Sequence, residues 1–311
     1  MNKKAKRAII VAVCVVLAIV LVVLPAIALF LYSTVFGKRY DKKPANMLHV
    51  ESFPGLQRDR YEITSNEGQT VVGYHYYRDD TEPKALVVMA HGIGGGGHNS
   101  YMDIDDYFTQ HGYDTFAYDV TGNDESEGSS VRGLPQGVID LDYVLDFVES
   151  CDDFAGLPIL LFGHSWGGYS VTSVLNEHPE VTAVCSVAGF NRSTDLLEAQ
   201  GKNMVGTAIY VFLPYLKIYE RIKFGEYSAQ TAMDGFANTD AKILIFHSED
   251  DTTVPIIYGY DIYYEAYADD PDFTFVRYTD KGHNDLLKLD KNPELMEKTV
   301  AFYDSVLSGG N

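Results

Sequence analysis

Apolar residues form one long uninterrupted run near the start of the chain. No charged residue occurs from Ala8 to Gly37, and the core of this run, Ala8–Leu31, is 24 residues long. A helix rising about 1.5 Å per residue would make it roughly 36 Å long, more than the ~30 Å hydrocarbon core of a bilayer. Pro25 is expected to kink the helix, which a transmembrane segment tolerates. The run is apolar on every face, so it predicts a transmembrane helix rather than a core helix.

A cleaved signal peptide is the alternative interpretation of this run. Ala26-Ile27-Ala28 resembles a small-residue cleavage site. However, the apolar core of a signal peptide is normally about 7–15 residues long, and here apolar residues continue past Ala28. We therefore favour an uncleaved helix. Residues 1–43 are assigned to an N-terminal membrane anchor with basic flanks, and residues 44–311 to the body of the protein.

Charge separates these two parts. The whole chain has a formal charge of −20, but residues 1–43 contain eight basic residues and one acid, a net charge of +7, which leaves −27 on the body. An acidic body repels phosphate backbones, which argues against nucleic-acid binding. Four basic residues precede the apolar run and four follow it, so the positive-inside rule is nearly balanced. A short basic N-terminus normally stays in the cytoplasm, and we predict a single-pass protein whose body is extracellular.

The body alternates between short apolar runs and segments with helical spacing. This alternation predicts an α/β domain with a mostly parallel, doubly wound sheet and helices on both faces. The strands are expected at Tyr61–Thr64, Thr70–Tyr77, Ala85–Ala90, Tyr113–Tyr118, Pro158–Phe162, Val181–Ala188, Lys242–Phe246 and Phe273–Tyr278. The helices are expected at Ser100–Gln110, Val138–Val148, Tyr169–Glu177, Ile256–Tyr267 and Glu294–Leu307.

One stretch, residues 190–239, interrupts the alternation. It contains the apolar run Met204–Leu216, which at 13 residues is too short to span a bilayer. We interpret residues 190–239 as a mostly helical cap inserted over the edge of the sheet. Two interpretations of the apolar run remain open: it packs the cap on the core, or it forms an apolar wall for the acyl chain of a substrate.

Candidate chemistry lies where predicted strands end. Gly163-His164-Ser165-Trp166-Gly167 matches G-x-S-x-G between a strand and a helix, the context in which this motif lifts a serine above a sheet. The alternative is a glycine-bearing turn with a capping serine, which the context disfavours. A serine nucleophile needs a base, and the base needs an orienting acid. Asp250 and Asp251 follow one later strand and His283 follows the next, in the order that the motif demands.

Together these pieces carry a family resemblance. They are His91-Gly92-Ile93-Gly94, Gly163–Gly167, the segment Asp251 to Pro255, and Gly282-His283. Over essentially residues 60–308 the chain resembles the α/β-hydrolase superfamily of serine esterases, lipases and peptidases, as a membrane-anchored bacterial-type member. The resemblance makes residues 44–311 an α/β-hydrolase domain that carries the cap.

The resemblance also implies roles for individual residues. Ser165 would be the nucleophile, His283 the general base and Asp251 the acid, because family sequences place Val-Pro three and four residues after the acid. Asp250 is the alternative acid. The backbone N–H groups of Ile93 and Trp166 would form the oxyanion hole, where each donor is typically worth about 10²–10³ in rate.

One loop departs from the family pattern. Many members have Asp-x-Arg-Gly-x-Gly-x-Ser after the next strand, whereas this chain has Thr121 in place of the arginine and Asp124 in place of the second glycine. Asp119 and Glu127 of this loop could contact a cationic substrate group. We expect them instead to be solvated loop charges.

The favoured function is a serine hydrolase that cleaves a carboxylic ester, with an amide or peptide bond as the alternative, through an acyl-enzyme intermediate. The competing functions are an aminopeptidase-like hydrolase, an acyltransferase and a catalytically inactive membrane-anchored binding protein. The expected partners are a small-molecule or lipid-like acyl substrate, or a peptide, and the membrane. The other histidines show no metal-ligand spacing, so we predict no metal and no organic cofactor. The sequence does not identify the substrate.

Overall fold

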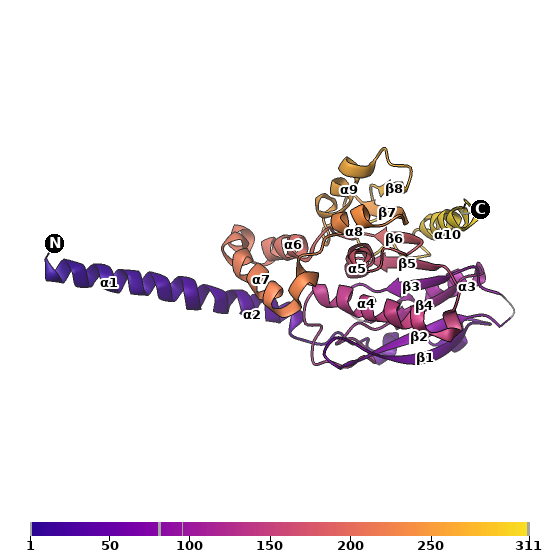
Figure 1. Ribbon diagram of the computed structural model, residues 1–311, viewed down its shortest axis with the longest axis horizontal. Helices are drawn as coiled ribbons and strands as arrows, with labels where there is room; N and C mark the ends of the chain where they lie inside the picture. The colour runs from indigo at the N-terminus through magenta and orange to yellow at the C-terminus, as the bar shows by residue number, and fades with distance from the viewer. Residues whose placement is uncertain (1, 80–81, 95, 310–311) are drawn as a thin grey trace.

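An eight-stranded sheet forms the centre of the molecule (Figure 1). The computed structural model describes residues 2–79, 82–94 and 96–309. The strand order is β1-β2-β4-β3-β5-β6-β7-β8; β2 pairs antiparallel with β1 and β4, and all other pairs are parallel. All eight expected strands are present, and the predicted α/β class is confirmed. The strands are β1 Gln57–Thr64, β2 Thr70–Tyr77, β3 Leu86–Ala90, β4 Asp114–Tyr118, β5 Ile159–His164, β6 Ala183–Val187, β7 Lys242–Ser248 and β8 Phe273–Tyr278.

Helices cover both faces of this sheet, which explains why its central strands are apolar at nearly every position. Every residue of β3 and β6 is buried. Side chains alternate along a strand, so Leu86 and Val88 pack into one core cluster with α4, α5, α8 and α9, while Val87 and Met89 pack into another with α3 and α10. These helices are α3 Met102–Gln110, α4 Pro135–Ser150, α5 Trp166–Ser173, α8 Ala232–Asn238, α9 Tyr260–Tyr267 and α10 Pro293–Gly309.

Some helix boundaries differ from the predicted ones. The helix expected at Tyr169–Glu177 begins three residues earlier, at Trp166, and ends at Ser173. The turn before this helix is tight, so the helix starts directly after Ser165. The spacing of apolar residues could not indicate this early start. The helix expected from Ser100 begins instead as a 3₁₀ turn over His98–Tyr101 and becomes α-helical at Met102.

The segment between β6 and β7 is helical. It contains α6 (Ser193–Val205), α7 (Ile209–Phe224) and α8. Figure 1 shows α6 and α7 projecting beyond the sheet on the side where the N-terminal helix leaves the domain. Part of the apolar run Met204–Leu216 packs inward, because Ile209, Leu213 and Leu216 are buried in the core cluster that contains α4 and α5.

A single long helix precedes the sheet domain. It is continuous over Lys3–Phe36, with a mean hydropathy of 3.4 in its most apolar window, and is long and apolar enough to cross a membrane. It comprises α1 (Lys3–Ala18), a five-residue π-helical stretch and α2 (Leu24–Phe36). The π-helical stretch, Ile19–Val23, ends two residues before Pro25, whose missing N–H leaves the carbonyl four residues earlier without its usual helical donor. Figure 1 shows α1 and α2 as one straight rod, so the kink expected at Pro25 is absent from this helix.

The last turns of this helix dock on α7, which lies within the predicted cap. Ala28, Tyr32 and Phe36, spaced four residues apart on one helix face, are buried, and α2 packs against α7. Tyr32 Oη donates a hydrogen bond to Glu220 of α7 at 2.9 Å, and Ser193 Oγ of α6 donates to the same carboxyl group at 2.7 Å. Buried polar groups are costly unless they are paired, so this three-residue network fixes how the helix sits on the cap.

The chain that follows the helix is also held by the domain. The Arg39 guanidinium donates to the carbonyl oxygens of Asp124, Ser126 and Gly128 at 2.8, 3.0 and 2.6 Å. The Lys42 N–H donates to Asp124 Oδ1 at 2.5 Å. The helix is therefore fixed to the domain on both sides of its C-terminal end, by the cap and by the loop after β4.

Glu220 should make stability depend on pH. Burial raises its pKa to about 7, although hydrogen bonds from Ser193 and Tyr32 oppose the shift. The folded state thus holds this proton more tightly than the unfolded chain, so the stabilisation is full below about pH 4.5 and is lost as the pH rises to about 7. Glu220→Gln, which is neutral at every pH, should remove this loss, which is at most about 3 kcal/mol. Thermal unfolding of the two full-length proteins at pH 5 and pH 8 measures it.

Glu226→Gln is the matched control, because the Glu226 side chain is 88% exposed. It should leave the difference between the two pH values as in the wild type. If Glu220→Gln also leaves that difference unchanged, the buried carboxyl group is not its source.

Candidate active site

Ser165 occupies a strained turn between β5 and α5. Its φ and ψ are 57° and −113°, a region that costs a non-glycine residue of order 1–3 kcal/mol. Flanking backbone holds the turn: the Ser165 N–H donates to the Val187 carbonyl at 2.8 Å. A Cβ at Gly167 would lie 1.9 Å from the Ala90 carbonyl oxygen, and one at Gly163 would lie 2.3 Å from the Gly167 oxygen. Only glycine fits at these two positions, and the sequence motif reflects that requirement.

Three side chains predicted from the sequence converge at this turn. His283 Nε2 lies 2.9 Å from Ser165 Oγ, and His283 Nδ1 lies 2.7 Å from Asp251 Oδ2. Asp251 follows β7 and His283 follows β8, so neighbouring parallel strands bring them to one edge of the sheet. The arrangement is a continuous hydrogen-bonded chain from a carboxyl group through an imidazole to a hydroxyl group, the geometry in which a base can activate a serine.

The two candidate acids have different partners. Asp251 is buried, and its Oδ1 accepts hydrogen bonds from the N–H groups of Thr253 and Val254 at 2.8 and 2.9 Å. Burial alone would raise the pKa of Asp251, but hydrogen bonds from His247, His283 and the Val254 N–H outweigh it and hold that pKa well below its usual range. Asp251 is therefore an ionised carboxylate facing the imidazole.

Asp250 contacts the loop that carries His283 rather than the imidazole ring. Its Oδ1 accepts from the Gly282 N–H at 2.8 Å and from Ser248 Oγ at 2.6 Å. These hydrogen bonds fix the backbone immediately before His283. Asp250 thus positions the loop that carries His283. The sequence alone could not distinguish this role from that of Asp251, which contacts the imidazole.

The two proposed oxyanion donors lie next to Ser165. Trp166 is the first residue of α5, so its N–H has no partner within that helix. Its ring is fully buried, and Nε1 donates to the Leu134 carbonyl at 2.7 Å. The backbone N–H is therefore the group of Trp166 that can donate to a bound substrate. Ile93 belongs to the loop after β3 and lines, together with Ser165, two cavities described below.

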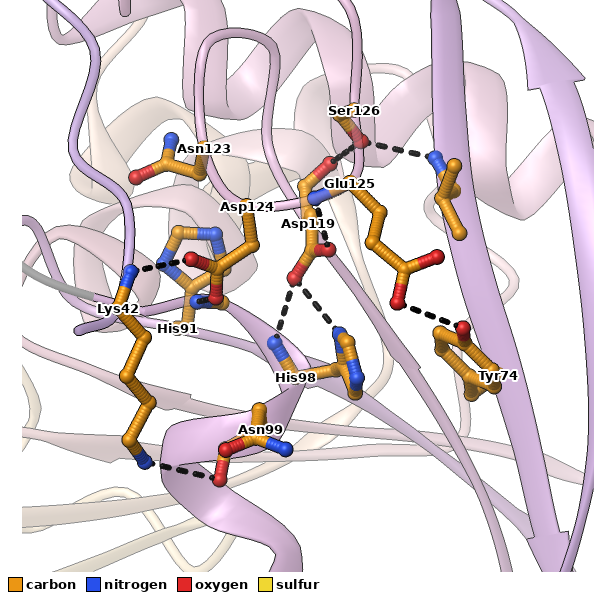
Figure 2. Close-up of polar contacts among 12 residues, drawn as sticks. Lys42, Tyr74, His91, His98, Asn99, Asp119, Asn123, Asp124, Glu125 and Ser126 are labelled. Atoms are coloured by element: carbon orange, nitrogen blue, oxygen red, sulfur yellow. Dashed lines mark hydrogen bonds and ion pairs between the residues drawn. The ribbon is translucent and has the colours of Figure 1, made fainter. Parts of the chain in front are cut away.

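A buried acid supports the glycine loop that contains Ile93 (Figure 2). Asp119 Oδ1 accepts from both the N–H and Nδ1 of His98 at 2.8 Å, and Asp124 Oδ2 accepts from the Gly97 N–H at 2.8 Å. Our expectation that Asp119 is a solvated loop charge is wrong, because its side chain is completely buried. Glu127 is exposed, as expected. Asp119 is buried because the loop after β4 folds onto the glycine loop, a contact that the sequence could not reveal.

His164, the residue before Ser165, packs beside His283. Its buried ring lies 4.9 Å from that of His283, centroid to centroid. Its Nδ1 is 3.1 Å from Tyr101 Oη, which accepts from the Gly92 N–H at 2.9 Å. Burial, followed by the nearby His283, lowers the pKa of His164 to about 3, so it stays neutral. His164 and Tyr101 therefore form an uncharged support between His283 and the glycine loop, and no sequence signal identified Tyr101.

Ser165 lies between two cavities, one apolar and one with a mixed lining. An apolar cavity of about 220 Å³ is lined by cap residues such as Leu196 and Met204 and by Leu31 and Val35 of α2. A second cavity of about 550 Å³ has a mixed lining, with the polar side chains of Tyr101, Asp103, Asn284 and Lys288 beside the apolar ones of Ile104 and Leu287. Ser165, Ile93 and Thr253 line both. A scissile bond at Ser165 would thus have an apolar environment on one side and a more polar environment on the other.

One histidine outside the site does group with acids, contrary to expectation. His178 Nδ1 lies 2.9 Å from Glu180 and its Nε2 lies 3.0 Å from Asp142, with Glu149 close by. Burial alone would lower the pKa of His178, but these carboxylates raise it to about 9. The cluster is accounted for as a protonated histidine paired with carboxylates. The absence of a metal or cofactor stays a prediction.

Alanine at position 167 should damage the turn. Its Cβ would meet backbone atoms of β3 that cannot move without disturbing the sheet, so we expect Gly167→Ala to lower the free energy of unfolding by at least about 2 kcal/mol. Gly309→Ala is the matched control, since a Cβ there has no neighbour within 4 Å. Thermal unfolding of both variants measures the difference. Equal melting temperatures would contradict the close approach described at the turn.

Comparison with known proteins places this geometry in a family. A family model described as serine aminopeptidase, S33, matches residues 81–242. Human monoglyceride lipase (Homo sapiens) is 33% identical over 106 residues, a match that spans 33% of this chain and about a third (34%) of the length of that relative.

Solved structures share the fold. An esterase from Pyrococcus furiosus superposes with a TM-score of 0.66 at 14% identity, covering 86% of this chain and 98% of its own. A puromycin-hydrolyzing peptidase from Mycobacterium tuberculosis gives a TM-score of 0.63 at 19% identity, covering 81% and 39% respectively. The family match extends over half of the chain, from before β3 to the start of β7, and includes Ser165. The chain therefore belongs to the serine aminopeptidase S33 family and has the α/β-hydrolase fold.

Proposed function

We propose that this protein is a serine hydrolase that cleaves a carboxylic ester through an acyl-enzyme intermediate. The observation that carries the proposal is the unbroken hydrogen-bonded chain Asp251–His283–Ser165, with the serine on a strained turn. The family match and the monoglyceride lipase relative support a hydrolase of this type. The apolar cavity beside Ser165 favours an ester with an aliphatic acyl group.

The chemistry follows from the positions of the proposed groups. Ser165 Oγ attacks the carbonyl carbon while His283 Nε2 accepts its proton, and the ionised Asp251 holds the imidazole in place. The N–H groups of Ile93 and Trp166 stabilise the negative charge that develops on the carbonyl oxygen. His283 then donates the proton to the departing alcohol. A water molecule, activated by the same imidazole, hydrolyses the acyl-enzyme and restores Ser165.

Cleavage of an amide or peptide with a free amino group is the second candidate. The description of the family as serine aminopeptidases supports it, as does Asp103 in the polar cavity. Burial raises the pKa of Asp103, which weakens it as a partner for a cationic amine at low pH. The apolar cavity on the other side of Ser165 makes the ester the better-supported substrate.

We also propose that the N-terminal helix is retained as an anchor, that residues 44–311 form the hydrolase domain and that residues 190–239 act as its cap. Ala28, the last residue of the alternative cleavage site, is buried against the domain, which supports retention. The basic N-terminus favours a cytoplasmic start and an extracellular domain.

Protease shaving of intact cells should therefore digest the domain, and resistance until lysis would place it inside.

Loss of the nucleophile should abolish turnover. Ser165→Ala should lower kcat for p-nitrophenyl esters by about 10⁴ or more and prevent labelling by a fluorophosphonate probe, because both reactions need the Ser165 hydroxyl group. Asp251→Asn should cost roughly 10³–10⁴ in kcat, since an amide cannot hold the imidazole in the required tautomer. Steady-state kinetics and probe labelling of the full-length proteins measure these effects.

Asp250→Asn is the matched control for the acid. It changes the neighbouring carboxylate, which contacts Gly282 and Ser248 and not the imidazole, and should cost less than about tenfold. Labelling of Ser165→Ala at the wild-type level would refute the nucleophile. A larger loss in Asp250→Asn than in Asp251→Asn would reverse the assignment of the acid.

A further inference from the structure

The apolar cavity at Ser165 has a wall that comes from outside the hydrolase domain. Leu31, Tyr32, Val35 and Phe36, in the last turns of the N-terminal helix, line it together with side chains of the cap. The cavity also reaches Ser165 itself. A helix that only tethered the domain to a membrane would have no reason to line a cavity that also reaches Ser165.

The position of this wall is fixed by buried polar contacts. Tyr32 Oη and Ser193 Oγ both donate to Glu220, which is 1% exposed. Directly after the helix, Arg39 donates to three carbonyl oxygens of the loop after β4, and the Lys42 N–H donates to Asp124 of the same loop. Asp124 also holds the glycine loop that contains Ile93. The helix end, the cap and the glycine loop are therefore one connected unit around the cavity.

The same wall lies next to the expected membrane surface. About 20 residues cross a hydrocarbon core, so a span that begins at Ala8 ends near Ile27, one residue before the buried face begins at Ala28. Figure 1 shows the helix leaving the domain on the side of α6 and α7. Exposed apolar side chains surround this region, with Phe30 67%, Met204 50% and Val211 50% exposed. Lipid, rather than water, is the favourable environment for such a surface.

We propose that the last two turns of the anchor helix form a specificity-determining wall of the acyl pocket, and that the substrate is an amphipathic ester whose aliphatic chain enters from the adjacent leaflet along this wall. This inference rests on the proposed hydrolase function. The acyl chain lies between Leu31 and Val35 on one side and Leu196 on the other. The polar alcohol part lies in the second cavity, near Asn284 and Lys288.

The reaction at this site is ordinary ester hydrolysis. The Ser165 Oγ–acyl bond forms as the acyl–oxygen bond of the ester breaks, and the serine proton passes through His283 to the released alcohol. Water then cleaves the acyl-enzyme, so that one ester and one water give one carboxylic acid and one alcohol. The polar product leaves toward solvent, and the acyl product returns along the anchor to the bilayer.

A bulky side chain on the wall should shorten the acyl chains that are accepted. The full-length protein in phosphatidylcholine nanodiscs is assayed with p-nitrophenyl acetate and decanoate, and the ratio of kcat/KM for decanoate to that for acetate is compared. Each methylene kept out of the pocket costs about fourfold in binding, so Leu31→Trp should lower this ratio roughly tenfold or more. Leu31→Ala should act in the opposite direction and raise the ratio for tetradecanoate over decanoate.

Leu29→Trp is the matched control. It makes the same substitution two residues earlier, at an exposed position that does not line the cavity, and should leave both ratios as in the wild type. Unchanged ratios in both Leu31 variants, or equal changes in Leu29→Trp and Leu31→Trp, would overturn the wall. A wild-type protein that neither turns over the acetate ester nor reacts with a fluorophosphonate would overturn the hydrolase proposal itself.

Discussion

The close approach of backbone at the Ser165 turn is the constraint on which the rest of the site depends. Gly167 lies against the Ala90 carbonyl of β3, and the Ser165 N–H is bonded to β6, so three strands must be in register before the turn can form. The strained φ of Ser165 is maintained by these contacts. Once the turn is fixed, the carboxyl ends of β7 and β8 bring Asp251 and His283 within hydrogen-bond distance. The proposed chemistry is thus a consequence of sheet order.

A second set of contacts surrounds Ser165, His283 and Asp251 and fixes the loops that shape the site. Asp250 holds the backbone before His283, while Tyr101 and the neutral His164 lie between the base and the glycine loop. Asp119 and Asp124 hold the other end of that loop, and Asp124 also binds the chain that follows the anchor. The N-terminal helix, the glycine loop and His283 are therefore linked by hydrogen bonds. The placement of the helix and the shape of the apolar cavity therefore cannot vary independently.

Much of this architecture could be predicted from the sequence, and the exceptions have physical causes. The central strands β3 to β7 were predicted because buried parallel strands are short apolar runs, and the G-x-S-x-G motif was located because only glycine tolerates such close packing. The start of α5 was predicted too late along the chain, because the residues of the tight turn do not show the regular spacing of apolar residues that marks a helix. The burial of Asp119 and the contact of Tyr32 with Glu220 join segments 21 and 188 residues apart. Contacts between such distant segments leave no local pattern in the sequence. The sequence of a helix that is apolar on every face also does not indicate which face packs against the domain.

A structure of the full-length protein after reaction with a long-chain alkyl fluorophosphonate would test the central claim most directly. The account predicts phosphorus bonded to Ser165 Oγ, its oxygen facing the N–H groups of Ile93 and Trp166, and the alkyl chain lying between Leu31 and Val35 of the anchor and Leu196 of the cap. An alkyl chain in the polar cavity beside Asn284 and Lys288, or a reagent bonded to any residue other than Ser165, would contradict it.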